Sequence, residues 1–386
     1  MTRPPMKRAP WPDSISRPVA TPLQPSVVYA AADPDALDAQ YEGATKGYTY
    51  AREGHPNAEV LAGLIDGMED ASGGVITGSG MAAVTVALLG HLKAGDHVIG
   101  ADQLYGRSLR LMTEELPRLG IDTSLADPTD VSAVASAIQP NTRMILIETV
   151  ANPTLRVADL EGIIKLGQAK GILVAVDNTF TTPSLLKPLT MGADIVLHSV
   201  TKMLAGHSDA TLGYVVSRDP ELNERMAALS ATMGTTPSPF DCWLAERGLY
   251  SFDMRFKRAS DTAAALADAL SGKPGVDRVL YPTRPDHPDH NRVKSLMPDT
   301  AGNMVSFELS GGRDAANRFT RALDGVAFAP TLGDIATTLS HPASSSHRGL
   351  TEDERLGLGI SQGFFRVSVG CEAPDDLIDA FLAALG

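Results

Sequence analysis

The chain has 386 residues, of which 43% are hydrophobic and 20% charged, a composition typical of a globular protein with two or three domains. Its formal net charge of −13 and its dispersed Lys and Arg argue against a nucleic-acid or anionic-membrane surface, so a small-molecule substrate is favoured. Two cysteines, Cys242 and Cys371, are too few for a disulfide framework, and no apolar run reaches the length of a membrane span. These features predict a cytoplasmic protein.

Residues 1–55 are rich in proline and small residues and are predicted to form an extended arm rather than a domain. The arm ends near Tyr50 and Arg52, within a group of aromatic residues beside an arginine. That grouping alone indicates packing in a loop. An arm with so little core of its own has to lie against another surface.

A glycine turn follows the first predicted strand. Apolar residues recur at helical spacing over residues 57–68, and residues 73–92 then predict a short strand, a tight turn and a helix. The turn at residues 78–83 has the form G-x-G-x-x-A, and Asp102 follows the next strand about 20 residues later, as in dinucleotide-binding folds. Free N–H groups at a helix N-terminus bind phosphate whichever molecule carries it. A nicotinamide- or flavin-dependent enzyme is therefore one hypothesis.

Residues 142–200 alternate apolar strands with helical segments, which predicts a mostly parallel sheet covered by helices. Polar residues follow the predicted strands, with Asp177 directly after the run ILVAV and Lys202 shortly after IVL. An aspartate in this place is costly to bury without a partner, so it either caps the following turn or pairs with a cationic group.

Lys202 lies between two hydroxyl residues and a run of small residues. Ser199 and Thr201 flank it at a spacing suited to a phosphate, and open α/β sheets bind ligands beyond the carboxyl ends of their strands. Gly206 and Gly213 allow the backbone to turn tightly beneath a planar ligand. A lysine after a strand is more often a plain surface residue, so its surroundings decide the interpretation.

The last part of the chain predicts a smaller α/β domain with a more antiparallel sheet. Arg366 lies inside an otherwise apolar strand, where an unpaired guanidinium is expensive, so a carboxylate partner is expected. The run from His287 to His290 has the histidine spacing of a metal site. Pro285 and Pro288 favour a loop, and further ligands are missing nearby, so the prediction is that no metal binds.

Four motifs occur in one order along the chain, and together they resemble a known family. They are the Ser-Gly-Met turn at residues 79–81, E-T-x-x-N-P-T at 148–154, D-N-T at 177–179 and S-x-T-K-x-x-x-G-H-S at 199–208. This pattern resembles the trans-sulfuration, or Cys/Met metabolism, family of fold-type I pyridoxal-phosphate enzymes. The resemblance implies an arm over residues 1–55 that reaches a neighbouring subunit, a cofactor domain over 56–245 and a small domain over 246–386. It also implies a homotetramer of two dimers, a long helix around residues 235–258 that joins the two domains, and a loop over residues 330–347 beside the lysine.

The resemblance also assigns roles to individual residues. Lys202 is expected to hold pyridoxal 5'-phosphate covalently and then to act as the base. The remaining cofactor contacts are implied for residues from several segments: Tyr50, Arg52, Gly80, Met81, Ser199 and Thr201 at the phosphate, and Tyr105, Asn152 and Asp177 at the ring. The resemblance also implies a catalytic role for Tyr105. Arg366 is expected to bind the substrate α-carboxylate, with Asn152 and the lysine-orienting Thr337 beside it.

The implied activity is that of a carbon–sulfur lyase of the cystathionine β- or γ-lyase type. Many cystathionine γ-synthases and γ-lyases have a glutamate that holds the distal amino group where this chain has Ala336. The segment with Gly333, Asp334 and Thr337 favours an O-acylhomoserine sulfhydrylase or a methionine γ-lyase, whereas Arg107 stands where methionine γ-lyases have cysteine. Lys202 argues against the nicotinamide enzyme, and a non-catalytic cofactor-binding protein is a further alternative. The substrate stays open among cystathionine, methionine, cysteine and O-acylhomoserine.

Overall fold

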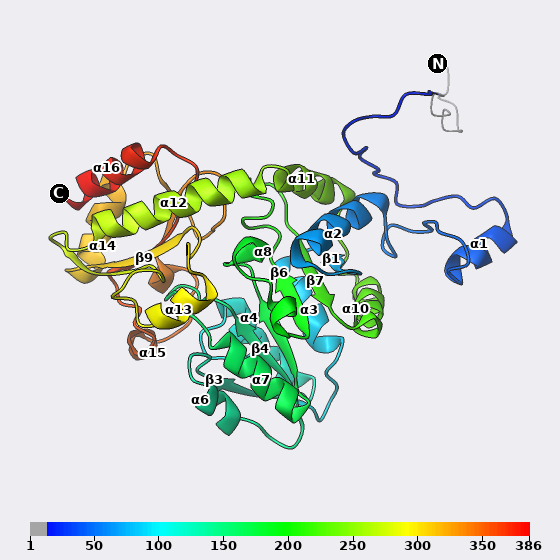
Figure 1. Cartoon of the computed structure of the whole chain (residues 1–386), viewed down its shortest axis with the longest axis horizontal. Coiled ribbons are helices and arrows are strands. Elements are labelled where there is room, and N and C mark those ends of the chain that lie inside the picture. The colour runs from blue at the N-terminus through cyan, green and yellow to red at the C-terminus, as the bar shows by residue number, and fades with distance from the viewer. Residues whose placement is uncertain (1–13) are drawn as a thin grey trace, which may run out of the picture.

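The computed structural model describes residues 14–386, which form two sheet-based units connected by a pair of helices, with the arm extending to one side (Figure 1). The arm is not wholly extended as predicted, because helix α1 (Pro34–Tyr41) forms within it. Asp33 caps this helix by accepting the N–H of Ala36, and Pro34 occupies the first helical position, where its missing N–H costs nothing.

The first unit contains a seven-stranded sheet in the order β1-β7-β6-β5-β4-β2-β3. Strand β7 runs antiparallel to both neighbours, and the other four pairings are parallel, which confirms the prediction of a mostly parallel sheet. The strands are β1 (Val75–Thr77), β2 (His97–Ala101), β3 (Asp122–Ala126), β4 (Thr142–Glu148), β5 (Leu173–Asp177), β6 (Ile195–His198) and β7 (Gly213–Ser217).

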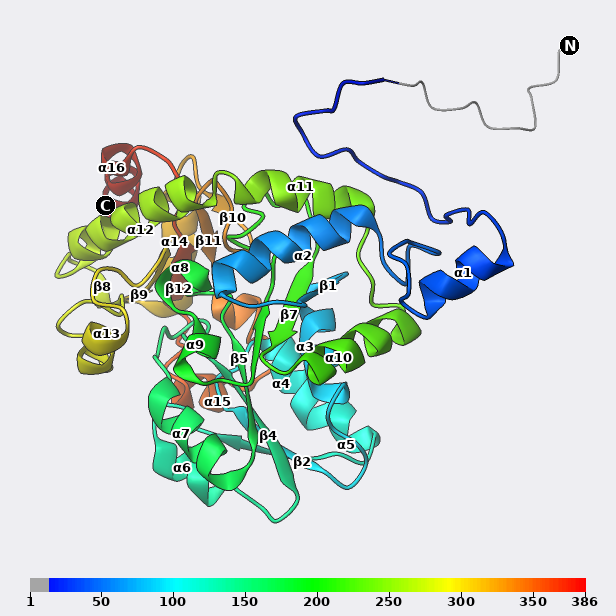
Figure 2. The ribbon, with the colours of Figure 1, turned by 45° about the vertical axis from the view of Figure 1, so that its right-hand side comes forward.

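Helices pack on both faces of this sheet, because its central strands are apolar on both sides. In β6, Ile195 and Leu197 join the apolar cluster of α3, whereas Val196 joins that of α2 on the other side (Figure 2). The helices of this unit are α2 (Pro56–Glu69), α3 (Gly80–Leu89), α4 (Gly106–Arg110), the π-helix η1 (Leu111–Glu115), α5 (Leu116–Arg118), α6 (Val131–Ser136), α7 (Leu160–Lys170), α8 (Thr182–Leu185), α9 (Pro188–Met191), α10 (Pro220–Met233) and α11 (Pro239–Leu249).

The second unit is built on a five-stranded sheet in the order β10-β11-β12-β9-β8. Its pairings are antiparallel except for β10 with β11, and a buried cluster of Phe307, Phe319, Phe365 and Phe381 fills the space between sheet and helices. The elements are α12 (Phe252–Leu270), β8 (Val276–Leu280), α13 (His290–Leu296), β9 (Met304–Leu309), α14 (Gly312–Ala322), β10 (Ala327–Phe328), β11 (Thr338–Ser340), the 3₁₀ helix η2 (Pro342–Ser344), α15 (Glu352–Gly357), β12 (Phe364–Ser368) and α16 (Pro374–Leu385).

Two further expectations about the second half of the chain need correction. The predicted long connecting helix around residues 235–258 is divided into α11 and α12, which are separated at Tyr250 and Ser251. Residues 330–347, expected as a loop, contain β11. The predicted division at residue 245 falls within α11, and both domain boundaries stay predictions. In residues 14–386 no helix combines the length and the apolar character that crossing a membrane requires.

Candidate active site

The predicted site residues follow strands that end at one edge of the large sheet. Glu148 and Asp177 are direct partners in the register of β4 and β5, and Asp177 is in turn the partner of Leu197 in β6. Because these strands are parallel, the segments after them meet at the same edge, where open α/β sheets form their ligand sites. Lys202 lies in the segment that follows β6.

A narrow contact joins the start of α3 to the segment that carries the lysine. Ser79 caps α3 by accepting the N–H of Ala82 at 3.1 Å, and Gly80 and Met81 have no intrahelical acceptor for their own N–H groups. A Cβ on Gly80 would lie only 2.7 Å from the Cβ and Oγ of Ser199, so glycine is required for this approach. The two N–H groups and the Ser199 hydroxyl therefore form a cradle of the kind that binds a phosphate.

Thr201 uses its hydroxyl within the protein. Its Oγ1 accepts the N–H of Leu212 at 2.9 Å and donates to the carbonyl of Leu212 at 3.1 Å. The pair closes the base of the segment that contains Lys202. The structure thus shows a role for the Thr201 hydroxyl in holding the backbone of Leu212. The contact of Thr201 with the phosphate stays a prediction.

Lys202 is partly buried, and no side chain of residues 14–386 hydrogen bonds its amine. Burial, and secondarily the positive charge of Arg366, lower the pKa of Lys202. A lowered pKa increases the neutral fraction of the amine, which is the form that acts as nucleophile or base. The backbone at Lys202 lies close to Gly333 of the second unit. A Cβ on Gly333 would be 2.4 Å from the Met203 nitrogen and 3.0 Å from the Lys202 Cα.

Asp177 is fixed by the residue that also fixes the cradle. Its Oδ1 accepts the N–H of Thr179 at 3.0 Å and the Thr179 hydroxyl at 2.5 Å, and the Thr179 oxygen accepts the N–H of Ser199 at 2.9 Å. Burial raises the pKa of Asp177, and the hydrogen bonds from Thr179 offset this only in part. Asp177 therefore caps the following turn through Oδ1, as one of the two alternatives predicted. A cationic ring nitrogen would add the ion-pair partner that the carboxyl does not have within residues 14–386.

Glu148 begins the E-T-x-x-N-P-T motif and is a further residue of the site, although no role was predicted for it from the sequence. Its Oε1 accepts the N–H of Tyr105 at 2.7 Å. Burial, followed by the neighbouring charge of Asp177, raises the pKa of Glu148 well above its ordinary value, which favours the protonated form of this carboxyl. The signal that pointed to Asp177, a carboxylate at the end of an apolar strand, applies equally to Glu148.

Tyr105 lies between the two units. Glu148 holds its backbone from the large sheet, and a Cβ on the adjacent Gly106 would lie 2.6 Å from the Ser346 carbonyl of the small unit. The Tyr105 side chain is 40% exposed, and its predicted stacking on the cofactor ring stays a prediction. Met81 is also placed near this segment, because its Sδ receives the Ser108 hydroxyl at 3.7 Å.

Arg366 is a buried cation that has no acidic partner within residues 14–386. In β12 it is 5% exposed, and it donates from Nη1 to Asn152 Oδ1 at 2.7 Å and from Nη2 to the Thr331 carbonyl at 2.8 Å. Its Nε is buried without an acceptor from residues 14–386. Burial lowers the pKa of Arg366 to about 10, which leaves it charged at neutral pH. A buried guanidinium that contacts neutral oxygens alone is prepared to receive an anionic ligand.

Thr337 is buried, but its hydroxyl is directed to an acidic neighbour. It donates to Glu372 Oε2 at 2.7 Å and accepts the Gly370 N–H at 2.9 Å, while the Thr337 N–H donates to the other Glu372 oxygen. The structure shows no hydrogen bond between Thr337 and Lys202. Its predicted role toward the lysine and the substrate stays a prediction, and Glu372 is a partner that the sequence did not reveal.

Tyr50 and Arg52 lie in the arm, apart from the cradle of their own chain. Tyr50 is 41% exposed and pairs with Val28, and the Arg52 guanidinium lies 5.5 Å from the Tyr50 ring centre and 3.3 Å from a Glu53 oxygen. Within the described part of the chain, neither side chain hydrogen bonds Gly80 or Ser199. Their predicted phosphate contact across a subunit interface stays a prediction.

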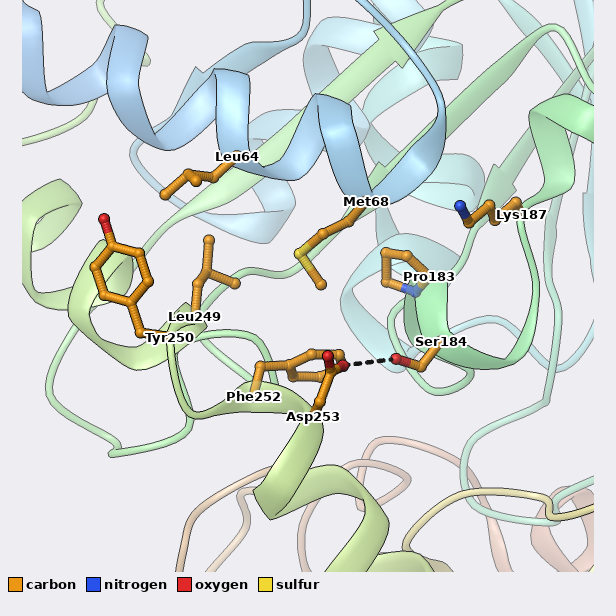
Figure 3. Close-up of a pocket in the computed structure, with 9 residues that line it drawn as sticks. All are labelled: Leu64, Met68, Pro183, Ser184, Lys187, Leu249, Tyr250, Phe252 and Asp253. Carbon is orange, nitrogen blue, oxygen red and sulfur yellow. Dashed lines mark hydrogen bonds between the residues drawn. The ribbon is translucent and has the colours of Figure 1, made fainter.

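A separate cavity of about 360 Å³ lies between α2, α8 and the junction of α11 and α12 (Figure 3). Its lining is mostly apolar, with the Ser184 hydroxyl 3.4 Å from Asp253 and with Lys187 at its edge, paired to Asp70. None of the predicted site residues lines it. The candidate active site is therefore the strand-end site, where the buried charged groups converge.

Comparison with known proteins identifies the family. The family described as Cys/Met metabolism PLP-dependent enzyme matches residues 8–386. The chain is 40% identical over 338 residues to cystathionine beta-lyase MetC of Bacillus subtilis, covering 88% of this chain and 86% of that protein. It is also 40% identical over 334 residues to an L-methionine gamma-lyase of Fusobacterium nucleatum subsp. polymorphum, covering 86% and 84%.

A solved structure supports the same assignment. A Campylobacter jejuni protein that contains N'-pyridoxyl-lysine-5'-monophosphate is 27% identical, with a TM-score of 0.92 and coverage of 97% of each chain. The predicted fold-type I architecture and the predicted cofactor are thereby confirmed. The chain belongs to the Cys/Met metabolism family of PLP-dependent enzymes, as its motifs predicted, and is an enzyme that acts on carbon–sulfur bonds.

Proposed function

We propose that this enzyme is a carbon–sulfur lyase that eliminates thiol groups from small sulfur amino acids, with cystathionine among its substrates. The observation that carries the proposal is Arg366, a buried cation with a free Nε and two neutral contacts. An α-carboxylate is the anionic group that every amino-acid substrate of such an enzyme presents. Pairing it with Arg366 supplies the missing counter-charge.

The residues at the strand ends fit the cofactor. The cradle of Gly80, Met81 and Ser199 would hold its phosphate, and the partly buried Asp177 would hold its ring nitrogen. Tyr105 is proposed to cover the ring, and Asn152 to contact the ring hydroxyl. Pyridoxal 5'-phosphate, when bound, supplies an electron sink for a carbanion at the substrate Cα.

The chain itself supplies orientation and proton transfer. Arg366 would fix the α-carboxylate, which limits the rotation of the substrate and sets the direction of its Cα–H bond. Lys202, with its lowered pKa, would hold the cofactor and then take the Cα proton on its Nζ. The carbon–sulfur bond would then break at Cβ, or, after a second proton is removed from Cβ, at Cγ, and the sulfur would leave as a thiol after it gains a proton.

Substrate selection is proposed to be broad, because no acidic side chain extends from position 336. Ala336 and Ile335 are exposed at the edge of the loop, and Asp334 is already bonded to the Ser208 hydroxyl. The distal ammonium of cystathionine therefore lacks an evident partner from this loop. Methionine γ-lyase and O-acylhomoserine sulfhydrylase activities are the alternatives, and the equal identity to a cystathionine lyase and a methionine lyase does not separate them.

The oligomeric state, the domain boundaries and the cellular location of the enzyme are proposed from the sequence. We propose a homotetramer in which Tyr50 and Arg52 of one subunit reach the phosphate of its neighbour, with the domain boundaries at residues 55 and 245. The arm supports this view, since both side chains are exposed and separate from their own cradle. A cytoplasmic location is proposed from the two cysteines, of which neither is paired.

A product assay tests the proposed function. Purified enzyme loaded with cofactor is given cystathionine, methionine, cysteine and, with sulfide, O-acetylhomoserine in separate reactions, and keto acid, ammonia and thiol are measured. Keto acid and thiol from cystathionine and at least one other sulfur amino acid are expected. Exclusive formation of homocysteine from O-acetylhomoserine and sulfide would instead establish the sulfhydrylase alternative.

A further inference from the structure

The histidine loop at residues 283–290 attaches the small unit to the large one through an acidic residue. Arg156 donates from Nε to Asp289 Oδ2 at 2.7 Å and from Nη2 to Oδ1 at 3.0 Å, and the Val157 N–H donates to Oδ2 at 2.9 Å. Arg292 in α13 donates to the carbonyls of Val157 and Thr129 at 2.7 and 2.9 Å. Figure 1 shows α13 at the boundary between the two units. We refer to the three residues that make these contacts, Arg156, Asp289 and Arg292, as the docking cluster.

Asp289 is held as a buried, charged acceptor. It is 8% exposed, and burial raises its pKa, but the hydrogen bonds from Arg156 and Val157, together with the nearby positive charge, lower the pKa by more. Its own N–H donates to His287 Nδ1 at 3.1 Å, and burial lowers the pKa of His287 to about 4, so that this imidazole is neutral. A two-point guanidinium–carboxylate pair has a defined geometry as well as strength.

The large-unit side of the docking cluster is the turn that carries Asn152. Ala151 donates to the Arg156 carbonyl at 2.8 Å, so Arg156 closes this turn at its base. At its tip, the Pro153 carbonyl accepts the Ser306 hydroxyl of β9 at 2.7 Å. Asn152, between these two points, accepts the 2.7 Å hydrogen bond from Arg366.

One continuous set of contacts therefore runs from Asp289 to the guanidinium. Asp289 fixes Arg156, the turn closed by Arg156 fixes Asn152, and Asn152 is one of two acceptors that orient Arg366. Asp289 itself has no hydrogen bond to Lys202, Asp177 or Arg366. Its influence on the site has to pass through the turn.

We propose that Asp289 is a positioning residue for the substrate α-carboxylate, an inference that rests on the proposed role of Arg366. With the docking cluster intact, Asn152 holds the guanidinium at the angle at which its free Nε faces the carboxylate. Without the charge on Asp289, the partly exposed Arg156 loses its two-point carboxylate partner, the turn shifts, and the substrate carboxylate is bound less tightly. The phosphate cradle and Asp177 lie on other segments and keep their geometry.

The variant Asp289→Asn in the holoenzyme tests this inference by separating KM from kcat. It keeps the size of the side chain but loses its charge, and KM for cystathionine is expected to rise about tenfold while kcat falls by less than about threefold. The content and absorption of bound cofactor should match those of the wild type. The matched control is Asp286→Asn, three residues earlier in the same loop, which loses a partly exposed pair with Arg284 and should change neither constant.

A binding measurement without turnover completes the test. L-norvaline has the amino and carboxyl groups of a substrate but no sulfur leaving group, and its binding is followed by the change in cofactor absorption. Asp289→Asn should weaken norvaline binding about tenfold, and Arg366→Lys should weaken it further. If Arg366→Lys weakens binding and folded Asp289→Asn does not, the inference about Asp289 is wrong although the proposed function stands.

If Arg366→Lys leaves norvaline binding unchanged, the proposed role of Arg366 itself fails. Thermal unfolding of each variant establishes that the folded protein is compared. Should Asp289→Asn not accumulate as folded protein, Arg156→Lys replaces it, because it keeps both charges and loses the two-point geometry. An increase in KM of about threefold is then expected, and an unchanged KM would overturn the inference.

Discussion

The cofactor side and the substrate side of the active site satisfy their charged groups differently. On the cofactor side, Asp177 receives two hydrogen bonds from Thr179, which also holds Ser199, so the cradle is fixed before any ligand arrives. On the substrate side, Arg366 is buried with neutral acceptors and an unused Nε. The cofactor side is therefore preorganised by hydrogen bonds within its own chain. The substrate side keeps a positive charge that an anionic ligand would neutralise.

The two sides also differ in their connection to the rest of the fold. The cofactor side is formed within one sheet, by segments that follow neighbouring parallel strands. The substrate side is formed between two units, because Arg366 comes from β12 and its acceptor Asn152 follows β4. Changes on the cofactor side should therefore affect chemistry and cofactor retention, and changes on the substrate side should affect KM.

The largest effect is expected for Lys202→Ala, which removes the anchor and the base at once. Turnover should fall by a factor of about 10³ or more, since a positioned acid–base group contributes on this scale. Borohydride reduction followed by mass spectrometry of peptides should find the cofactor on Lys202 in the wild type and on no lysine in the variant. An adduct on Lys187, which borders the separate cavity, would falsify the assignment.

Arg366→Ala should give the next largest effect, and it should fall on substrate binding. Loss of a desolvated charged partner costs roughly 2–5 kcal/mol, so KM should rise about 30-fold or more for every amino-acid substrate. Cofactor absorption should be unchanged, because Arg366 lies outside the cradle. Arg278→Ala is a useful control, since Arg278 belongs to the same unit and pairs with Glu308 away from the site. A fall in kcat with an unaltered KM would contradict this assignment.

Subunit mixing tests whether the cofactor side is complete within one chain. Arg52→Ala and Lys202→Ala should each be inactive, but a heterodimer of the two would contain one site with both residues intact. Random exchange of equal amounts should therefore return activity to about a quarter of the wild-type value, for a two-fold dimer. If exchange is demonstrated by labelled subunits and no activity returns, Arg52 does not act on the neighbouring site.

Ala336→Glu adds an acidic group on the substrate side and should alter selectivity moderately. A partly exposed ion pair with the distal ammonium of cystathionine is worth about 1 kcal/mol, so the ratio of kcat/KM for cystathionine over methionine should rise about fivefold. Ala336→Gln is the matched control without charge. If the wild type already prefers cystathionine by several orders of magnitude and the ratio does not change, another residue recognises the distal amine.

The sequence revealed the cofactor side better than the substrate side, for a physical reason. A polar residue directly after an apolar strand is a local signal, and it located Asp177 and Lys202. A charge inside an apolar strand is equally local, and it located Arg366. Pairings between distant segments leave no such signal, so Arg156 with Asp289, 133 residues apart, and Thr337 with Glu372, 35 apart, went unrecognised.

Elements of the fold also differ in how strong a local signal they leave in the sequence. The parallel strands of the large sheet were predictable from their apolar runs, whereas the edge strand β3, with its partly exposed DTSLA residues, and the short β11 have weak apolar signals. The break between α11 and α12 was missed because apolar residues continue at helical spacing on both sides of Tyr250 and Ser251. Continuity of an apolar stripe does not require continuity of the helix that carries it.

The smallest effect is expected for Glu148→Gln, and it concerns the stability of the cofactor side. Glutamine resembles the protonated carboxyl that burial and Asp177 favour at position 148, and its oxygen can still accept the Tyr105 N–H. In the wild type the folded chain keeps this proton while the unfolded chain loses it as pH rises above the ordinary value of 4.5, so stability falls with rising pH until the raised folded pKa is passed.

Glutamine does not titrate, so the variant apoenzyme should escape this loss. Its Tm should exceed that of the wild-type apoenzyme by roughly 2–4 °C at pH 8, and the difference should shrink as pH falls toward 4.5. Thermal unfolding at a series of pH values between 4 and 8 provides the measurement. A variant that is less stable than the wild type at pH 8 would show that Glu148 is ionised in the fold, and the two strand-end carboxyls would then both require cationic partners.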